Sequence, residues 1–210
     1  MSRTYWQDLA RQELALPFLS SAVVDGRTVA CLRGPFSTAM AIGADLPFAE
    51  LQVADSIRTL AVDGAPAIVM QEPELHVKTL IQPYEAAVLE SYARLRRIFQ
   101  DLGVDALLQV TGVLSRNHVS GLARALHPAV LSLGASRRLY EDVALVPKDI
   151  VLHGNLPAAL FTGSTSEMAR QAEQLRRAMR ATGHPHILGT DGAILSSDAL
   201  PENVEALLTL

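Results

Sequence analysis

The sequence predicts an α/β protein whose strands form a parallel (β/α) barrel of the TIM type, incomplete and with about six strand–helix units. Short aliphatic runs alternate with longer amphipathic stretches along the chain, and this order is typical of a parallel sheet covered by helices. Neither a G-x-G-x-x-G segment after the first strand nor a GxxxxGK[ST] segment occurs, so the two common phosphate-binding forms of a doubly wound sheet are not supported. A complete barrel needs eight units and typically ~250 residues, whereas this chain has 210.

Six mostly aliphatic runs are expected to form the strands, and neighbours in the chain are expected to be neighbours in the sheet. Their continuous apolar character is that of strands buried on both faces. They comprise residues 28–32, 67–71, 106–110, 129–133, 150–153 and 186–189.

The stretches between these runs have the apolar spacing of amphipathic helices. They cover residues 48–62, 84–102, 119–126, 137–145 and 166–182. Ser166 is expected to cap the last of them and Gly183 to end it, and Pro201 suits the first turn of a final helix. Residues 1–210 are treated as one domain, with residues 1–27 as a helical extension.

Composition and charge exclude several classes of protein. Hydrophobic residues make up 49% of the chain and charged residues 19%, which is typical of a globular protein rather than a disordered one. The net charge of −4 gives no basic surface for nucleic acid. The N-terminus lacks the apolar core of a signal peptide, and no apolar run approaches the ~18 residues of a membrane span. The single cysteine, Cys31, fits a cytoplasmic location.

Four stretches in order along the chain resemble the uroporphyrinogen decarboxylase family. They are VACLRGPFSTAMAIG at 29–43, DGAPAIVMQEPELH at 63–76, VPKDIVLHGNLPAALFTGSTSEMARQ at 146–171 and ALPENVEA at 199–206. The family belongs to a superfamily with zinc-dependent corrinoid methyltransferases and cobalamin-independent methionine synthase, all on (β/α)₈ barrels. The resemblance implies a (β/α) barrel whose ligand lies at the carboxyl ends of the strands.

The departures from the family are equally specific. The N-terminal third of the family, with its first strands and an arginine-rich loop, has no counterpart here. Ala41 stands where the decarboxylases carry a substrate tyrosine, and Thr190 stands where they carry a histidine. The family's GNLDP stretch is shortened to GNLP at 154–157, without the acid.

No metal site is expected. The stretches that correspond to the zinc ligands of the methyltransferases, at 108–112 and 190–192, contain neither histidine nor cysteine. A site built from Cys31, His76, His153 and Asp191 is the alternative, but no pair of them has a recognised short ligand spacing. Cys31 lies in an apolar run, where a small buried core residue is expected.

Glu72 and His76 follow the second predicted strand and are the first candidates for catalysis. A carboxylate at this position binds a cationic group or acts as a base, and a histidine titrates near neutral pH. The alternative is a loop carboxylate and a solvent-exposed histidine. Asp191, after the last strand, is the third catalytic candidate, although Asp is also common in turns.

Four further residues are expected to bind the substrate. Arg33, just after the first strand, suits a carboxylate or phosphate, or pairs with a loop acid. Phe36 belongs to the GPF segment of the resemblance. Asn155 and Thr190 offer hydrogen bonds after the last two strands, beside glycines that also suit tight turns. Because the carboxyl ends of parallel strands open on one face of a barrel, all these side chains are expected at one rim.

Three functions remain open at this point, and whether the chain is an enzyme is open with them. The first is decarboxylation of a tetrapyrrole without a cofactor, as the family resemblance implies. The second is methyl transfer of the methionine synthase type, which would involve a corrinoid or folate, or zinc. The third is a non-catalytic partner subunit on the same scaffold. An incomplete barrel has open strand edges, so we expect a homo-oligomer or a partner chain, with the edge at 28–32 or a helix over 5–19 at the contact.

Overall fold

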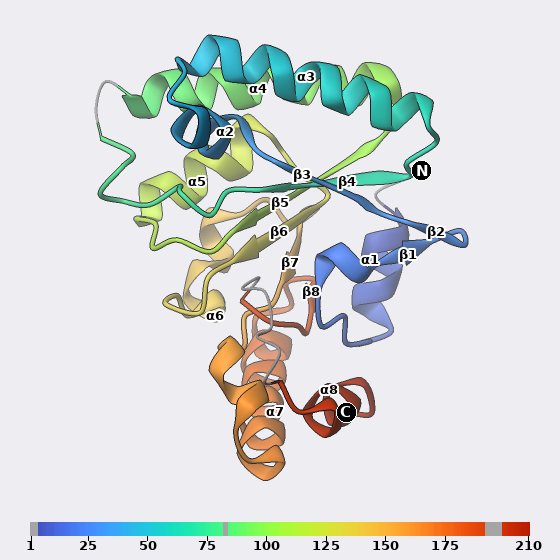
Figure 1. The fold of residues 1–210 in the computed structure, drawn as a ribbon. Helices are drawn as coiled ribbons and strands as arrows, with labels where there is room; N and C mark the ends of the chain where they lie inside the picture. The colour runs from blue at the N-terminus through green and yellow to red at the C-terminus, as the bar shows by residue number, and fades with distance from the viewer. Residues whose placement is uncertain (1–3, 82–83, 192–198) are drawn as a thin grey trace.

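The computed structural model describes residues 4–81, 84–191 and 199–210, and its centre is a parallel sheet of six strands. The strands follow each other in the sheet in chain order, as the sequence predicts (Figure 1). They are β3 (Ala30–Arg33), β4 (Ala67–Gln71), β5 (Asp105–Val110), β6 (Val130–Leu133), β7 (Val151–His153) and β8 (His186–Ile187). The α/β class, the parallel pairing and the strand order are therefore confirmed, with strand ends shifted by up to two residues.

The first strand begins later than the sequence predicts because a small hairpin precedes it. β1 (Val23–Val24) pairs in antiparallel fashion with β2 (Arg27–Thr28). The turn between them is Asp25-Gly26, and both residues have positive φ angles of 50° and 76°. Asp-Gly is among the strongest short-range signals for a hairpin, so this element was detectable in the sequence.

Helices cover one face of the sheet. They are α2 (Pro35–Ile42), α3 (Leu46–Val62), α4 (Tyr84–Leu102), α5 (Arg116–Ala125) and the short α6 (Leu139–Asp142). Their apolar faces pack on alternate strand residues such as Met70, Leu108 and Leu131, all of which are buried. The expected helix at 48–62 begins two residues earlier at Leu46, with Asp45 accepting a hydrogen bond from Phe48 N at 2.8 Å. The helix expected at 137–145 is shorter, because it gives way to a 3₁₀ turn after Asp142.

Two helices complete the C-terminal part of the fold. α7 (Thr165–Thr182) ends at Gly183, which has φ 63°, as expected. The N-cap position is Ser164 rather than Ser166, and the two hydroxyls lie 2.8 Å apart. α8 (Pro201–Leu208) starts with proline in its first turn, as expected, and Leu207 packs with Met168 of α7.

The N-terminal segment packs on the other face of the sheet, which we call the inner face. α1 (Thr4–Arg11) and the hairpin lie on the side opposite to α3 and α4 (Figure 1). Trp6 and Val24 are fully buried against inner-face residues such as Leu107 and Val151. The prediction of a single helix over 5–19 is wrong, because α1 ends at Arg11 and the chain turns back toward the sheet.

The returning chain extends the sheet beyond β8. Ala15 forms a parallel bridge with Leu188, Leu16 N donates to Leu188 O at 2.8 Å, and Thr190 N donates to Pro17 O at 3.0 Å. β8 is therefore covered at its outer edge, whereas β3 is the last strand at the other end of the sheet among the described residues. None of the helices in the described ranges has the length and apolar character needed to cross a bilayer.

Candidate functional site

A row of polar side chains crosses the inner face at the carboxyl ends of five strands. Strand pairing places Arg33 beside Gln71, Gln71 beside Gln109, Gln109 beside Ser132, and Ser132 beside His153. The residues two positions earlier face the same side and are apolar on the four central strands, as with Leu107 and Val151. We call these five residues the polar row. It marks the change from an apolar interior to a polar rim.

The end of the row near β3 is accessible. Arg33 is exposed and Gln71 is half-buried, whereas Gln109 is 4% exposed. Gln71 Nε2 donates to Gln109 Oε1 at 2.9 Å, which fixes both amide groups. Each amide has a second hydrogen-bonding atom, Gln71 Oε1 and Gln109 Nε2. A guanidinium and two oriented amides at one edge suit a small ligand that carries a carboxylate.

The other end of the row is closed and serves packing. His153 is fully buried, with Nε2 2.7 Å from Leu16 O and Nδ1 3.1 Å from Ser132 Oγ. Leu16 O accepts only, so Nε2 carries the proton and Nδ1 accepts from the Ser132 hydroxyl. Burial lowers the pKa of His153 to about 4, although the hydrogen bond to Leu16 opposes the shift. The neutral imidazole holds the N-terminal segment on the sheet.

Glu72 is not a rim carboxylate, which corrects the first catalytic candidate. It is fully buried and accepts hydrogen bonds from Phe36 N at 3.1 Å and Ser37 N at 2.7 Å, and a further one from the Tyr92 hydroxyl. The carboxylate thus satisfies the first free N–H groups of α2. Burial raises the pKa of the Glu72 carboxyl, while the hydrogen bonds from Ser37, Tyr92 and Phe36 oppose the shift.

Phe36, a predicted substrate-binding residue, is also part of the packing. Its side chain is buried and meets the ring of Tyr84 edge to face, with ring centroids 5.9 Å apart. The backbone of Gly34 lies so close to Glu72 that a Cβ at this position would overlap the carboxylate. Glu72, Phe36 and Gly34 therefore form one compact helix start rather than a ligand pocket.

The remaining candidates lie at the carboxyl ends of their strands but in two separate places. His76 is half-buried in the loop after β4, where Nδ1 accepts from Lys78 N at 3.0 Å. Asn155 is buried, and its Nδ2 donates to Gly134 O at 2.9 Å and Arg137 O at 2.8 Å.

The last two candidates follow β8. Thr190 is buried, and Asp191 N donates to Leu156 O at 2.8 Å. Asn155, Thr190 and Asp191 thus share one loop cluster near β7 and β8, far along the sheet from Arg33. The glycine that follows Asp191 lies outside the described residues.

The side chains of the described residues do not fit zinc. In the described ranges, no group of three or more His, Cys, Asp or Glu side chains can hold a metal ion. Cys31 is exposed rather than buried, which corrects the expectation for this residue. It lies on the accessible inner face of β3, two residues before Arg33. His153 uses both ring nitrogens in hydrogen bonds within the fold.

Three small cavities lie among the described residues. One of about 350 Å³ lies beside Asn155, with Arg138, Tyr140 and Gln174 at its wall, and two others measure about 340 and 380 Å³. Pockets for drug-sized ligands span roughly 300–1,000 Å³, so these volumes suit ligands much smaller than a tetrapyrrole. Gln71 and Gln109 were missed in the sequence because each lies within an apolar run, and the register that aligns them is set by distant pairing.

Comparison with known proteins places the fold. No protein-family model matches the sequence, and no curated protein matches it significantly. Among solved structures, a methyltransferase from Methanosarcina mazei is similar with a TM-score of 0.61 and 18% sequence identity, over 78% of this chain. This chain spans 47% of that structure, about half of its length. At this identity the likeness concerns the fold alone.

Proposed function

We propose that this chain is a cytoplasmic subunit of a methyl-transferring enzyme of the corrinoid methyltransferase and methionine synthase superfamily. Its part is to bind a small polar substrate on the polar row at the carboxyl ends of β3, β4 and β5. The alignment of Arg33, Gln71 and Gln109 by strand pairing carries the proposal. The fold likeness to a methyltransferase supports it.

In methyl transfer, a nucleophile attacks the methyl carbon while the bond to the methyl carrier breaks and the carrier keeps the electron pair. A protein accelerates this step by holding both reactants in line. Arg33 would bind the carboxylate of the acceptor, and the paired amides of Gln71 and Gln109 would orient it. A corrinoid or folate would supply the methyl group. Because the described side chains do not fit zinc, no step of the reaction is assigned to a metal held by this chain.

We also propose that a second chain covers the β3 edge and completes the catalytic barrel. β3 is the outermost strand there in the described part of the sheet. The two helices that follow it expose large apolar side chains, each at least half accessible: Met40, Ile42, Phe48 and Leu51. An open strand edge beside apolar side chains is typical of a protein contact. Sedimentation velocity at micromolar concentration tests whether the second chain is another copy.

Calorimetric titration with homocysteine, a small amino-acid thiol, tests the binding proposal. Wild-type protein is expected to bind it saturably. Arg33→Ala is expected to weaken binding roughly ten- to a hundred-fold, because charge-assisted hydrogen bonds contribute about 1.5–3 kcal/mol. Arg97→Ala, which removes an exposed arginine from helix α4, is the matched control and should bind as wild type. Absence of saturable binding, or equal losses in both variants, would contradict the proposal.

A non-catalytic partner subunit is the second candidate. It is favoured by the commitment of Glu72 and His153 to hydrogen bonds within the fold. The visible spectrum of methylcobalamin separates the two functions, because loss of its methyl group changes that spectrum. Methyl transfer to homocysteine in the presence of the chain supports the enzyme. Absence of both homocysteine binding and methyl transfer supports the partner subunit.

A further inference from the structure

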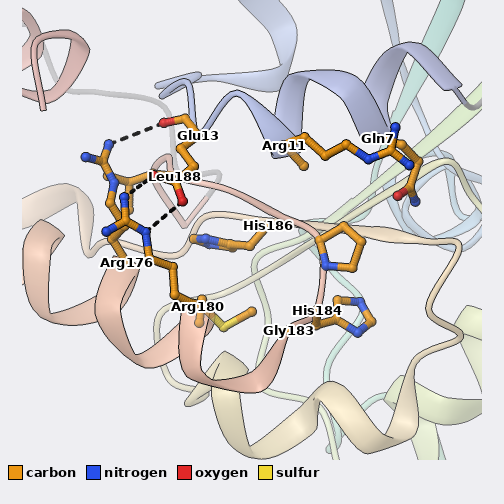
Figure 2. Close-up of a pocket in the computed structure, with 12 residues that line it drawn as sticks. Gln7, Arg11, Glu13, Arg176, Arg180, Gly183, His184, His186 and Leu188 are labelled. Atoms are coloured by element: carbon orange, nitrogen blue, oxygen red, sulfur yellow. Dashed lines mark hydrogen bonds and ion pairs between the residues drawn. The ribbon is translucent and has the colours of Figure 1, made fainter.

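A second cavity lies away from the polar row, between α1 and α7 at the amino end of β8. Its volume is about 340 Å³. Its walls come from α1, from the last turns of α7 and from the loop that leads into β8 (Figure 2). The cavity is therefore at the opposite end of the strand from Thr190 and Asp191.

Guanidinium groups dominate the chemistry of this cavity. Arg11, Arg176 and Arg180 line it, and Glu13 is the one carboxylate side chain among its described lining residues. Arg176 is 9% exposed, and it donates to the main-chain oxygens of Leu210 and Glu13. A buried guanidinium that donates to main-chain oxygens retains a strong attraction for an anion.

Glu13 occupies the position that an anion would take. Its carboxylate pairs with Arg180, with Nε 2.8 Å from Oε1 and a second contact through the other guanidinium nitrogen. Its main-chain oxygen faces Arg176 at 3.5 Å. Figure 2 shows both guanidinium groups directed toward Glu13. Arg180 is half exposed, so this ion pair is in contact with solvent and is open to competition.

Two histidines on the cavity wall stay neutral and add hydrogen-bonding atoms. His184 Nε2 lies 3.0 Å from Ile150 O, and His186 Nε2 lies 2.5 Å from Gly154 O. Both bonds place the proton on Nε2 and leave Nδ1 as an acceptor. Burial lowers the pKa of both rings, that of His186 to about 4. A ligand with both an acidic group and a hydroxyl group would match this combination of donors and acceptors.

We propose that this cavity binds a small oxyanion of the phosphate or carboxylate class through Arg176 and Arg180, in competition with the carboxylate of Glu13. The cavity volume is at the lower end of the range for ligand pockets, so the ligand is small. Binding would free Glu13 from Arg180 and alter the contact between α1 and α7. The site is independent of the polar row, and its test does not depend on methyl transfer.

Calorimetric titrations with inorganic phosphate and with succinate, in chloride buffer of constant ionic strength, test the site. At least one of the two anions is expected to bind saturably. Arg180→Gln should weaken that binding roughly tenfold or more, because it removes a charge-assisted contact. Arg177→Gln is the matched control, since Arg177 lies on the same helix, pairs with Glu173 and does not line the cavity.

Glu13→Gln provides a test with the opposite sign. It removes the competing carboxylate, so the anion should bind more tightly than to wild type, by several-fold. This variant keeps the proposal testable if Arg180→Gln fails to fold, which circular dichroism reports. The proposal is overturned if neither anion binds saturably, if the Arg177 and Arg180 variants lose affinity equally, or if Glu13→Gln weakens binding. The anion that binds with the higher affinity shows whether a phosphate or a carboxylate is the preferred group.

Discussion

Replacing Glu72 by glutamine is expected to destabilise the protein while leaving ligand binding at the polar row nearly unchanged. The carboxylate accepts hydrogen bonds from Phe36 N, Ser37 N and the Tyr92 hydroxyl in a fully buried position. Glutamine keeps the size of the side chain but replaces one acceptor oxygen by an NH₂ group that faces a donor. One buried donor then lacks a partner, which costs about 1–3 kcal/mol.

This loss is large enough to measure by unfolding. In a chain of 210 residues, 1 kcal/mol corresponds to roughly 2–4 °C in Tm, so the variant is expected to melt roughly 2–12 °C below wild type. Urea denaturation followed by circular dichroism at pH 7 gives the free energy directly. Tyr92→Phe removes a single donor and should cost about 1 kcal/mol.

Glu74→Gln is the matched control for this prediction. Glu74 is two residues away and exposed, and its contact with Ser37 runs through its own main-chain nitrogen. Its free energy of unfolding should stay within about 0.5 kcal/mol of wild type. Equal stability of the Glu72 and Glu74 variants would refute the role of Glu72 at the start of α2. It would also reopen Glu72 as a residue that acts on a ligand.

Three further predictions test other parts of the account. The folded-state pKa of His153, about 4, lies below its ordinary 6.5, so the unfolded chain takes up a proton that the folded chain does not. The stability that the neutral His153 contributes is present above pH 6.5 and should fall by up to about 3 kcal/mol as the pH drops toward 4. Urea denaturation of wild type and of His153→Gln across this pH range checks the prediction. The same pH dependence of the free energy of unfolding in both proteins would contradict it. Gly189→Ala should destabilise the protein by about 3 kcal/mol or more, because the added Cβ would overlap His153 and the main chain at Leu16. Urea denaturation midpoints should show a much smaller effect for Gly26→Ala, where the space is open but φ is positive. Purified protein should contain no stoichiometric zinc, because the described side chains offer no group of three ligands; one tightly held zinc per chain by mass spectrometry would show that a ligand set was missed.

The sheet could be predicted from the sequence because its strands are short, apolar and separated by helices with clear periodicity. α4 agrees with its predicted bounds at both ends, since Tyr84–Leu102 has an uninterrupted amphipathic pattern. α2 was not predicted, although Pro35 lies in its first turn, where proline is common. The N-terminal return of the chain was also missed, because it depends on packing against β7 and β8 rather than on local propensity.

The sequence indicates which polar residues follow the strands, but it does not indicate which of them form hydrogen bonds within the fold. The partners of Glu72 are main-chain N–H groups of residues 36 and 37 and the hydroxyl of Tyr92, none of them close in sequence. Gln71 and Gln109 meet because β4 and β5 pair in one register. A local sequence pattern contains neither the distant hydrogen-bond partners of a side chain nor the register of strand pairing.

Nuclear magnetic resonance of the glutamine side-chain amides tests the central claim most directly. The claim is that the polar row binds a small polar ligand, and Gln71 and Gln109 carry NH₂ groups that report contact. On titration with homocysteine, these two amide signals are predicted to shift together and to saturate, while the signal of Gln52, exposed on α3, stays in place. Saturable shifts confined to other residues, with the Gln71 and Gln109 signals unmoved, would contradict the account.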